Sequence, residues 1–290
     1  MIKKYVLLIL LTLAAFSCSV SRFIPENERL YTGARLKIKS DTLIKGKGKL
    51  KEVLLNVIEP KPNNKFLGSH FGLYYYYKAQ KETSSFVTKW LNKQMGEEPV
   101  YQSDVAALQI EKLLLNRLEN RGFFYNQITS NFTEKEKRAF ADFNVKIKQP
   151  YTMASFQLDT LSPPIYREMQ DNLKTSKFSK GMRFDLANLK LERERIDKNL
   201  KKKGYYNFSP EFLVFEADTN QYNNKRFDLY LKLKQGVPSK AIKPYKISEI
   251  NVFPNYTVEK DTLDLDTIRF NNKNYISKEV FLNRNIWILI

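Results

Sequence analysis

The sequence contains one phrase twice, each time after a stretch of helical character. The phrase reads RLENRGFFYNQI at 117–128 and returns as NLKKKGYYNFSP at 199–210. Each copy is followed by a segment of alternating apolar and polar residues, ADFNVKIKQ at 141–149 and RFDLYLKLKQ at 226–235. Because two elements recur in the same order after about 82 to 86 residues, the chain is predicted to consist of tandem copies of one small domain.

The first copy is predicted to begin with a strand at 36–40 and a helix over 48–58, which Pro60 and Pro62 end. A second helix is predicted to start near Ser103, as its N-cap, and to stop at Gly122. Strands over 125–132 and 143–147 should then pair. The buried faces of the two helices are predicted to carry Leu50, Val53, Leu54, Val57 and Ile58, and Val105, Leu108, Leu115 and Leu118.

The second copy follows the same plan. A strand over 151–159 and a helix over 166–173 precede a turn that delivers Asp185 as the N-cap of a second helix, which Gly204 ends. Strands over 212–218 and 227–235 complete a hairpin. The buried face of the second helix is predicted to carry Leu186, Leu189, Ile196 and Leu200.

A third copy is predicted to open with a strand at 245–253 and to continue with a helix over 276–285, with Ser277 as its N-cap. The pattern breaks off there, so we expect the sequence to be a truncated or frameshifted form of a longer protein. The predicted divisions are a signal peptide at 1–17, a tether at 18–35, a first domain at 36–150 with an insertion at 63–99, a second domain at 151–240, and the start of a third at 241–290.

The fold class predicted from these elements is α+β. Each module should form a small mixed sheet covered on one face by two helices.

The first residues have the character of an export signal. Lys3 and Lys4 precede an apolar run that is too short to span a bilayer comfortably. Cys18 is the only cysteine and lies where such a signal would be cut, after Ala15, Phe16 and Ser17. One cysteine cannot form an internal disulfide, so we interpret Cys18 as a lipidation site, with an ordinary cleaved signal as the alternative.

The chain is strongly basic, with a formal charge of +18 that falls to +16 when Lys3 and Lys4 are removed with the signal. Of its 49 basic residues, 36 are lysines and 13 are arginines. Arginine dominates bidentate phosphate recognition, so this balance favours a solvated or membrane-facing surface over a nucleic-acid partner.

Motifs for catalysis are missing from the sequence. With His70 as the only histidine, a histidine metal cluster and a Ser-His-Asp triad are excluded or nearly so. No Gly-rich phosphate loop or HExxH motif appears. We therefore expect no enzyme activity, no catalytic residue, no metal and no cofactor.

The strand-helix-helix-strand-strand order, with an aromatic phrase after the second helix, resembles the POTRA domain (polypeptide-transport-associated). The segments IPENERLYTG after Cys18, PKPNNKFLG at 60–68 and GEEPV at 96–100, and the QPY and KPY starts of successive copies, are similar to the lipoprotein branch of the BamA/TamA outer-membrane assembly family of Bacteroidetes-type bacteria.

This resemblance implies a periplasmic array that handles unfolded β-barrel clients or assembly partners, anchored to the outer membrane through Cys18 and followed in the full-length protein by a C-terminal barrel. It also implies that the second strand of each sheet is an exposed edge, to which an extended client adds by β-augmentation. The implied client-binding residues are Tyr125, Asn126, Gln127, Ile128 and Thr129 in the first copy, and Phe212, Leu213, Val214, Phe215 and Glu216 in the second.

Two other interpretations stay open. The chain could be a stand-alone periplasmic lipoprotein scaffold that holds folded partners. It could also bind envelope glycan through the tyrosines at 74–77 and Trp90, although these aromatic residues could equally pack in a core.

Overall fold

The computed structural model describes residues 20–66, 68–159, 163, 165–254 and 266–277. The chain divides into two compact units. The first contains the residues up to Gln157 together with Lys177–Glu192 and Phe215–Leu231, and the second contains Leu158–Ser176, Arg193–Val214 and the residues from Lys232 onward.

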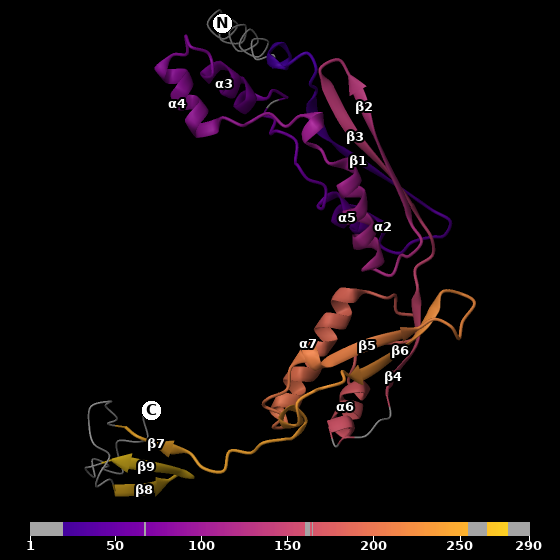
Figure 1. Cartoon of the computed structure of the whole chain (residues 1–290), viewed down its shortest axis with the longest axis vertical. Helices are drawn as coiled ribbons and strands as arrows, with labels where there is room; N and C mark the ends of the chain where they lie inside the picture. Colours follow the sequence, from indigo (N-terminus) through magenta and orange to yellow (C-terminus); the bar gives the residue numbers. More distant parts are fainter. Residues whose placement is uncertain (1–19, 67, 160–162, 164, 255–265, 278–290) are drawn as a thin grey trace, which may run out of the picture. The chain divides into compact units, whose positions relative to one another are not determined.

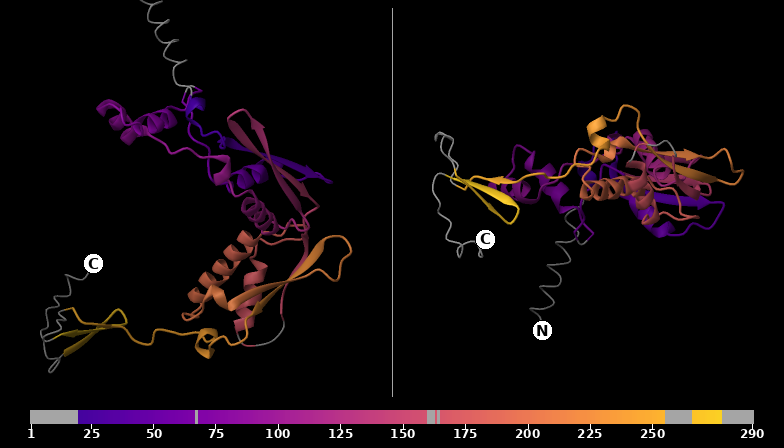
Figure 2. Two further views of the ribbon diagram at one scale, coloured as in Figure 1. Left: turned by 45° about the horizontal axis from the view of Figure 1, so that its top comes forward. Right: turned by 90° about the horizontal axis from the view of Figure 1, so that it is seen from below.

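The first unit contains a complete three-stranded sheet with the order β1-β3-β2 (Figure 1). Strand β1 (Leu30–Ser40) runs parallel to β3 (Arg138–Ile147), and β2 (Gln127–Lys135) runs antiparallel to β3. Helices α2 (Lys47–Leu55) and α5 (Ala107–Glu119) lie along one face of this sheet (Figure 2). The two edge strands of this sheet are therefore β1 and β2.

The core of this sheet follows from the alternation in its strands. Residues of β3 at alternate positions are buried, and they meet the buried stripes of the two helices. The main core side chains are Leu36, Ile38, Leu50, Leu54, Ile110, Leu114, Leu118, Phe143, Val145 and Ile147.

The second helix of this module differs from its prediction. It begins at Ala107 rather than near Ser103, because residues 102–104 form a separate 3-10 turn and the Ser103 hydroxyl donates to Glu28. The buried stripe is Ile110, Leu114 and Leu118, one side chain every four residues. Leu108 is 73% exposed, so its predicted place in the core is wrong. The first helix likewise ends at Leu55, and Ile58 is buried after the helix end.

A second sheet has the order β4-β6-β5, formed by β4 (Thr152–Leu158), β6 (Arg226–Leu233) and β5 (Leu213–Asp218). Helices α6 (Ile165–Lys174) and α7 (Leu186–Lys202) stand between β4 and β5 in the sequence. Asp185 accepts a hydrogen bond from the Ala187 N–H at 3.0 Å, as its predicted capping role requires. The same element order thus occurs twice, and the predicted α+β class is confirmed.

The third copy has a different structure from its prediction. A sheet of order β7-β9-β8 is formed by β7 (Asn251–Val252), β9 (Lys273–Ser277) and β8 (Asp266–Phe270). Asn271 and Asn272 both have positive φ, which fits a tight hairpin turn between β8 and β9. Ser277 is therefore a strand residue and its predicted role as an N-cap is wrong. The rest of the predicted helix lies outside the described residues.

The insertion of the first copy forms two helices, α3 (Phe71–Ala79) and α4 (Phe86–Met95), which pack against each other. They lie close together at Gly72, where an added Cβ would be 2.8 Å from the Met95 carbonyl oxygen. Within the described ranges, no helix combines the length and apolar character needed to cross a membrane.

The repeated aromatic phrase forms the same helix end in both copies. Gly122 has a φ of +79°, its N–H donates to Glu119 O at 2.9 Å, and the Phe123 N–H donates to Leu118 O at 3.0 Å. This pair of bonds is a Schellman C-cap. Its aromatic residue, Phe123, is fully buried and lies in the same core cluster as Leu118.

The second copy reproduces this cap bond for bond. Gly204 has a φ of +94° and donates to Lys201 O, while Tyr205 donates to Leu200 O at 3.1 Å. The glycine and the aromatic residue after it are thus required together: the first adopts a left-handed conformation and the second is buried under the helix end.

Each cap glycine also binds the chain that follows the module. The Tyr151 N–H donates to Gly122 O at 2.9 Å, and the Tyr245 N–H donates to Gly204 O at 2.7 Å. A Cβ at Gly122 would lie 2.7 Å from the Phe184 carbonyl oxygen, and a Cβ at Gly204 would lie 2.5 Å from that of Tyr245. We call these two contacts the glycine joints.

Replacing Gly122 or Gly204 by Ala is expected to lower the free energy of unfolding by about 1–2 kcal/mol from the left-handed backbone alone, and further from the backbone contact. Chemical denaturation of the full chain measures this loss. Gly48→Ala in α2 is the matched control, since no atom lies within 4 Å of its Cβ position and its φ is not positive. That control should gain about 0.5–1 kcal/mol. Equal effects at Gly48 and Gly122 would contradict the assigned role of the joint.

A buried carboxylate lies on the face of the first sheet opposite the helices. Asp142 on β3 accepts two hydrogen bonds from Arg35 on β1, at 2.8 and 3.2 Å, and one from the Thr133 hydroxyl on β2 at 2.5 Å. Burial alone would raise the pKa of Asp142, but these donors hold it below its ordinary value. The corresponding Asp228 on β6 accepts from Ser155 and Tyr222. One carboxylate thus ties all three strands of the first sheet together.

Asp142→Asn is expected to lower the free energy of unfolding by about 1–2 kcal/mol at neutral pH. This loss is at the low end for hydrogen bonds to a charged group, because Arg35 is half-exposed and solvent screens its charge. The folded pKa is depressed, so this stabilisation is present above the unfolded pKa of about 4 and is lost as the pH falls through the folded value. Denaturant titrations of the parent and the Asp142→Asn variant should therefore give different free energies of unfolding at neutral pH and the same value at about pH 2. A deficit of the same size at both pH values would contradict the assignment.

Candidate functional site

Strand β2 is an edge of the first sheet, and part of the predicted client-binding segment lies on it. Gln127, Ile128 and Thr129 are its first three residues. Tyr125 and Asn126 precede the strand: Tyr125 has a φ of +58°, and the Asn126 side chain donates to Phe123 O at 2.6 Å. These two residues form the turn after the helix. The strand extends beyond the predicted range, to Lys135.

The backbone of β2 alternates between facing β3 and facing outward. The Ser130 N–H donates at 2.7 Å to the Glu111 carboxylate, which also accepts from the Ser130 hydroxyl at 2.5 Å. This N–H therefore points away from β3. In an antiparallel ladder, residues two apart direct their backbone groups the same way, so those of Ile128 and Phe132 also turn to the open edge.

Strand β5 is an edge of the second sheet and shows the same alternation. Phe212 O accepts from the Lys234 N–H at 2.9 Å, on the side of β6. Leu213 O instead accepts from the Arg193 guanidinium at 3.3 Å, on the other side. Phe212 belongs to a 3-10 turn, and the strand proper begins at Leu213. Val214 therefore turns its backbone toward β6, and Phe215 turns outward.

The side chains on β5 differ in their surroundings. Leu213 is fully buried, while Val214 and Phe215 are half-buried. The ring of Phe215 lies 6.0 Å from those of Phe156 and Phe178, centre to centre. Glu216 is exposed. The apolar side chains of this edge are thus fixed by packing, and its outer backbone groups are what a partner strand could reach.

The side chains that reach the two edges come from equivalent helix positions. Glu111 precedes Leu118 by seven residues, and Arg193 precedes Leu200 by the same interval. Both leucines accept the Schellman bond that ends their helix. Counting back from the cap glycine would have located both residues in the sequence, but they were not predicted as part of a site. We refer to Glu111 and Arg193 as the edge latches.

The four tyrosines of the insertion pack rather than form an open platform. Tyr74 is buried with Leu73, Val20, Ile24 and Leu30, and Tyr75 and Tyr77 pack against this cluster. The Tyr77 and Tyr101 hydroxyls lie 2.6 Å apart. Tyr76 is half-buried and meets Tyr77 edge-on. The glycan-binding interpretation thus loses its stacking surface at the tyrosines, whereas Trp90 is exposed.

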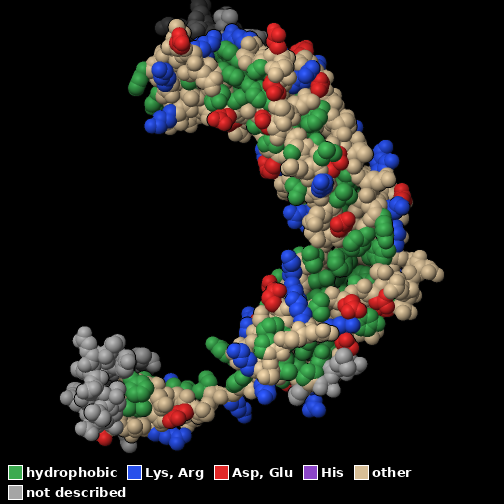
Figure 3. Space-filling model, in the orientation of Figure 1, with side chains coloured by type: hydrophobic (Ala, Val, Ile, Leu, Met, Phe, Trp, Pro, Cys, Tyr) green, Lys and Arg blue, Asp and Glu red, His purple; other side chains and the backbone are tan. Residues whose placement is uncertain are grey.

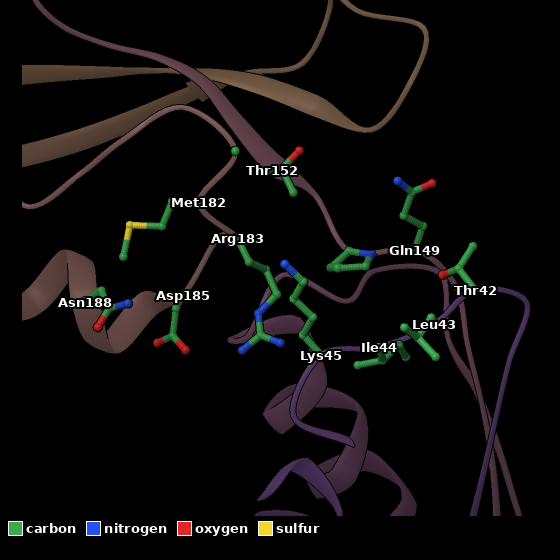
Figure 4. A pocket seen from close by; sticks show the side chains of 12 residues that line it. Thr42, Leu43, Ile44, Lys45, Gln149, Thr152, Met182, Arg183, Asp185 and Asn188 are labelled. Atoms are coloured by element: carbon green, nitrogen blue, oxygen red, sulfur yellow. The ribbon is translucent and has the colours of Figure 1, made fainter. Parts of the chain in front are cut away.

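A pocket of about 600 Å³ lies beside the first glycine joint (Figure 4). Lys45 and Arg183 extend toward it, and Asp185 and Asn188 line it from the start of α7. Burial lowers the pKa of Arg183, whose guanidinium lies 5.0 Å from the centre of the Phe123 ring. Asp185 is engaged in capping α7, so the pocket offers cations and amides rather than an acid–base pair. In the part of the chain that the structure describes, no cluster of acidic, histidine or cysteine side chains could hold a metal ion.

Cys18 and the predicted signal peptide lie outside the described residues. The described chain begins at Val20, which is buried against α3.

No family model matches the chain, and no curated protein matches it. Solved structures with some likeness include BamA from Haemophilus ducreyi lacking POTRA domains 1-3, with a TM-score of 0.36, 15% identity, and coverage of 71% of this chain and 29% of that one. POTRA1-3 of Omp85 from Anabaena gives a TM-score of 0.33 at 14% identity, over 71% of this chain and 62% of that one. POTRA3-5 of Haemophilus influenzae BamA gives a TM-score of 0.28 at 14% identity, over 73% of this chain and 99% of that one.

The chain therefore spans only part of the first two structures. At TM-scores of this size, what the chain can do has to be derived from its own strands and helices.

Proposed function

We propose that this chain is the periplasmic POTRA region of an outer-membrane protein assembly factor. It captures extended segments of unfolded β-barrel clients, or of assembly partners, by adding them to the edges β2 and β5. Cys18 carries lipid that anchors the chain to the outer membrane, and a C-terminal barrel belongs to the full-length protein. The activity of such a whole protein, insertion included, is part of this proposal.

The observation that carries the proposal is the hydrogen bond from the Ser130 N–H to Glu111. It marks an edge backbone donor that points away from the sheet and is held by a side chain rather than by another strand. A client carbonyl can take the place of the carboxylate without disturbing the ladder between β2 and β3. The nine-residue length of β2 offers room for several such exchanges.

The expected affinity suits capture and release. Four or five backbone hydrogen bonds at a net 0.5–1.5 kcal/mol each give about 2–7.5 kcal/mol before ordering costs, which corresponds to dissociation constants from tens of millimolar down to micromolar. The affinity is lower still because the client must first displace Glu111 or Arg193 from the edge. A transient complex of this strength allows a client to be passed onward.

The edge is tested by placing a photo-crosslinking residue at Thr129, which is exposed on β2, and adding a denatured outer-membrane barrel protein to the full chain. Crosslinks are expected at Thr129 and not at Lys37, an exposed residue on the opposite edge β1. Ser130→Pro should abolish them, because it removes the outward N–H and its ring fills the edge while the ladder to β3 is left intact.

Ser130→Ala is the matched control, because it keeps the N–H and loses only the hydroxyl, and its crosslinks should persist. Circular dichroism of both variants checks that the fold is retained. Undiminished crosslinking in a folded Ser130→Pro protein would refute β-augmentation at β2.

Removing the latch should make the edge more available. Glu111→Ala leaves the Ser130 N–H without its acceptor, so client crosslinking at Thr129 is expected to rise. The free energy of unfolding should fall by about 1–2 kcal/mol. Glu111→Gln retains an acceptor oxygen and should resemble the parent in both measurements. If Glu111→Ala loses stability and captures no more client than Glu111→Gln, then Glu111 is a structural contact and not a latch.

A further inference from the structure

The insertion helix α4 exposes a row of large apolar side chains. The exposed fractions are 84% for Phe86, 61% for Val87 and 52% for Trp90, and no residue of α4 is buried. Phe86 and Trp90 are four residues apart and thus lie above one another on the helix, with Val87 beside them. An exposed aromatic row of this kind is rarely left uncovered in a working protein.

The apolar row continues into a pocket. Leu91 and Met95 follow Val87 around α4 and line a hollow of about 600 Å³ together with Phe66, Phe71 and Tyr75. Phe66 is 68% exposed and Met95 is 47% exposed. The row and the pocket form one apolar surface, which we call the hairpin face.

The flank of the hairpin face is basic. Lys89 and Lys93 are exposed and lie four residues apart, next to the Phe86–Trp90 row. Helix α4 contains no acidic residue. Figure 3 shows hydrophobic side chains gathered over α3 and α4 with Lys and Arg side chains among them. Phenylalanine and tryptophan beside lysine is the pattern of helices that lie in the interface of an anionic membrane.

The hairpin does not rely on this face to hold its position. The Asn63 and Asn64 side chains donate to Glu97 at 3.3 and 2.6 Å, and Asn63 accepts from the Val100 N–H at 2.9 Å. These contacts join the two ends of the insertion, the segments PKPNNKFLG and GEEPV of the sequence. Burial alone would raise the pKa of Glu97, but its asparagine donors lower it. This clasp closes the base of the insertion through polar contacts and involves none of the side chains of the Phe86–Trp90 row.

The hairpin also lies at the start of the described chain. Val20, Phe23 and Ile24 pack on Leu73 and Tyr74 of α3. The Phe23 ring stacks on Tyr77 at 5.4 Å. Only Ser19 lies between Cys18 and Val20, so the two Cα atoms are at most about 7 Å apart along the chain. A lipid at Cys18 would therefore hold a bilayer surface next to α3 and α4.

We propose that the hairpin face seats in the headgroup interface of an anionic lipid membrane, with Phe86, Val87 and Trp90 in the apolar boundary and Lys89 and Lys93 at the phosphates. This inference draws on the proposed anchor at Cys18 for proximity and is otherwise independent of client capture. The hairpin would give the lipidated chain a second, oriented contact with the membrane, since one attachment point leaves a module free to rotate.

Depth-dependent quenching tests the proposal in the full chain. Trp287, the only other tryptophan, is replaced by Phe so that Trp90 reports alone. The protein is reconstituted on phosphatidylethanolamine–phosphatidylglycerol vesicles in which part of the acyl chains are brominated. Trp90 is expected to lose most of its emission and to shift to the blue.

The control chain carries Trp90→Phe, Trp287→Phe and Gln127→Trp. Gln127 is exposed at the end of β2 that pairs with Lys146, about 27 Å along β3 from Arg138, the partner of Leu30 near the hairpin. Its tryptophan should keep most of its emission. Replacing Lys89 and Lys93 by Gln should reduce the quenching of Trp90 on these vesicles and make it insensitive to salt.

An unquenched Trp90 on vesicles that carry the chain overturns the proposal, and so does equal quenching at positions 90 and 127. Quenching of Trp90 by soluble envelope polysaccharide but not by brominated lipid overturns it in favour of a glycan. Crosslinking at Thr129 separates the two proposals, because Phe86→Ser with Trp90→Ser should release the hairpin from lipid and leave client capture unchanged. Loss of membrane attachment in Cys18→Ser tests the anchor on its own.

Discussion

The glycine joints are the contacts on which the tandem arrangement depends. In each, the carbonyl of the cap glycine accepts the N–H of a tyrosine in the chain that follows the module. Tyr151 immediately precedes β4, and Tyr245 lies six residues before β7. Only glycine satisfies both demands at Gly122 and Gly204, a positive φ and a backbone approach under 3 Å. The aromatic residue that follows then seals the helix end. Helix termination, core burial and contact with the chain that follows thus depend on two consecutive residues, which explains why this phrase is repeated so recognisably.

The helix that ends at a joint also serves the sheet edge. Two turns before Leu118, Glu111 reaches the backbone of β2, and two turns before Leu200, Arg193 reaches that of β5. One latch accepts and the other donates, so the common feature is position rather than charge. An uncovered edge invites aggregation, and a side chain occupies it less permanently than a strand would. Under the proposed function, Glu111 and Arg193 would meet two opposed requirements, protection of the edge at rest and access for an extended partner.

The sequence predicts the repeat, the element order and the cap at Asp185, because these follow from short-range patterns. It places Val105, Leu115 and Leu118 correctly at the core but puts Leu108 there wrongly and misses Ile110 and Leu114, because several leucine stripes fit a helical period and only the sheet decides between them. The Asn271–Asn272 turn was overlooked although paired asparagines favour such hairpins. Glu111 can be located only by counting back from the cap glycine, because its partner is a backbone N–H nineteen residues away and no local pattern marks the contact. Contacts between a side chain and a distant backbone leave no periodic trace.

The insertion at 63–99 departs from the repeat. Its helix α3 buries Leu73 and Tyr74, whereas its helix α4 buries none of its apolar side chains. In the rest of the first module the large apolar side chains form the core, but those of α4 lie outside it. The insertion is held by the apolar packing of α3 on Val20 and Ile24 and by amide and carboxylate contacts at its base. A segment whose fold does not depend on its apolar face can present that face elsewhere at little cost in stability. The insertion lies beside Val20. If Cys18 is lipidated, the membrane that it tethers would therefore be the apolar phase nearest to the insertion.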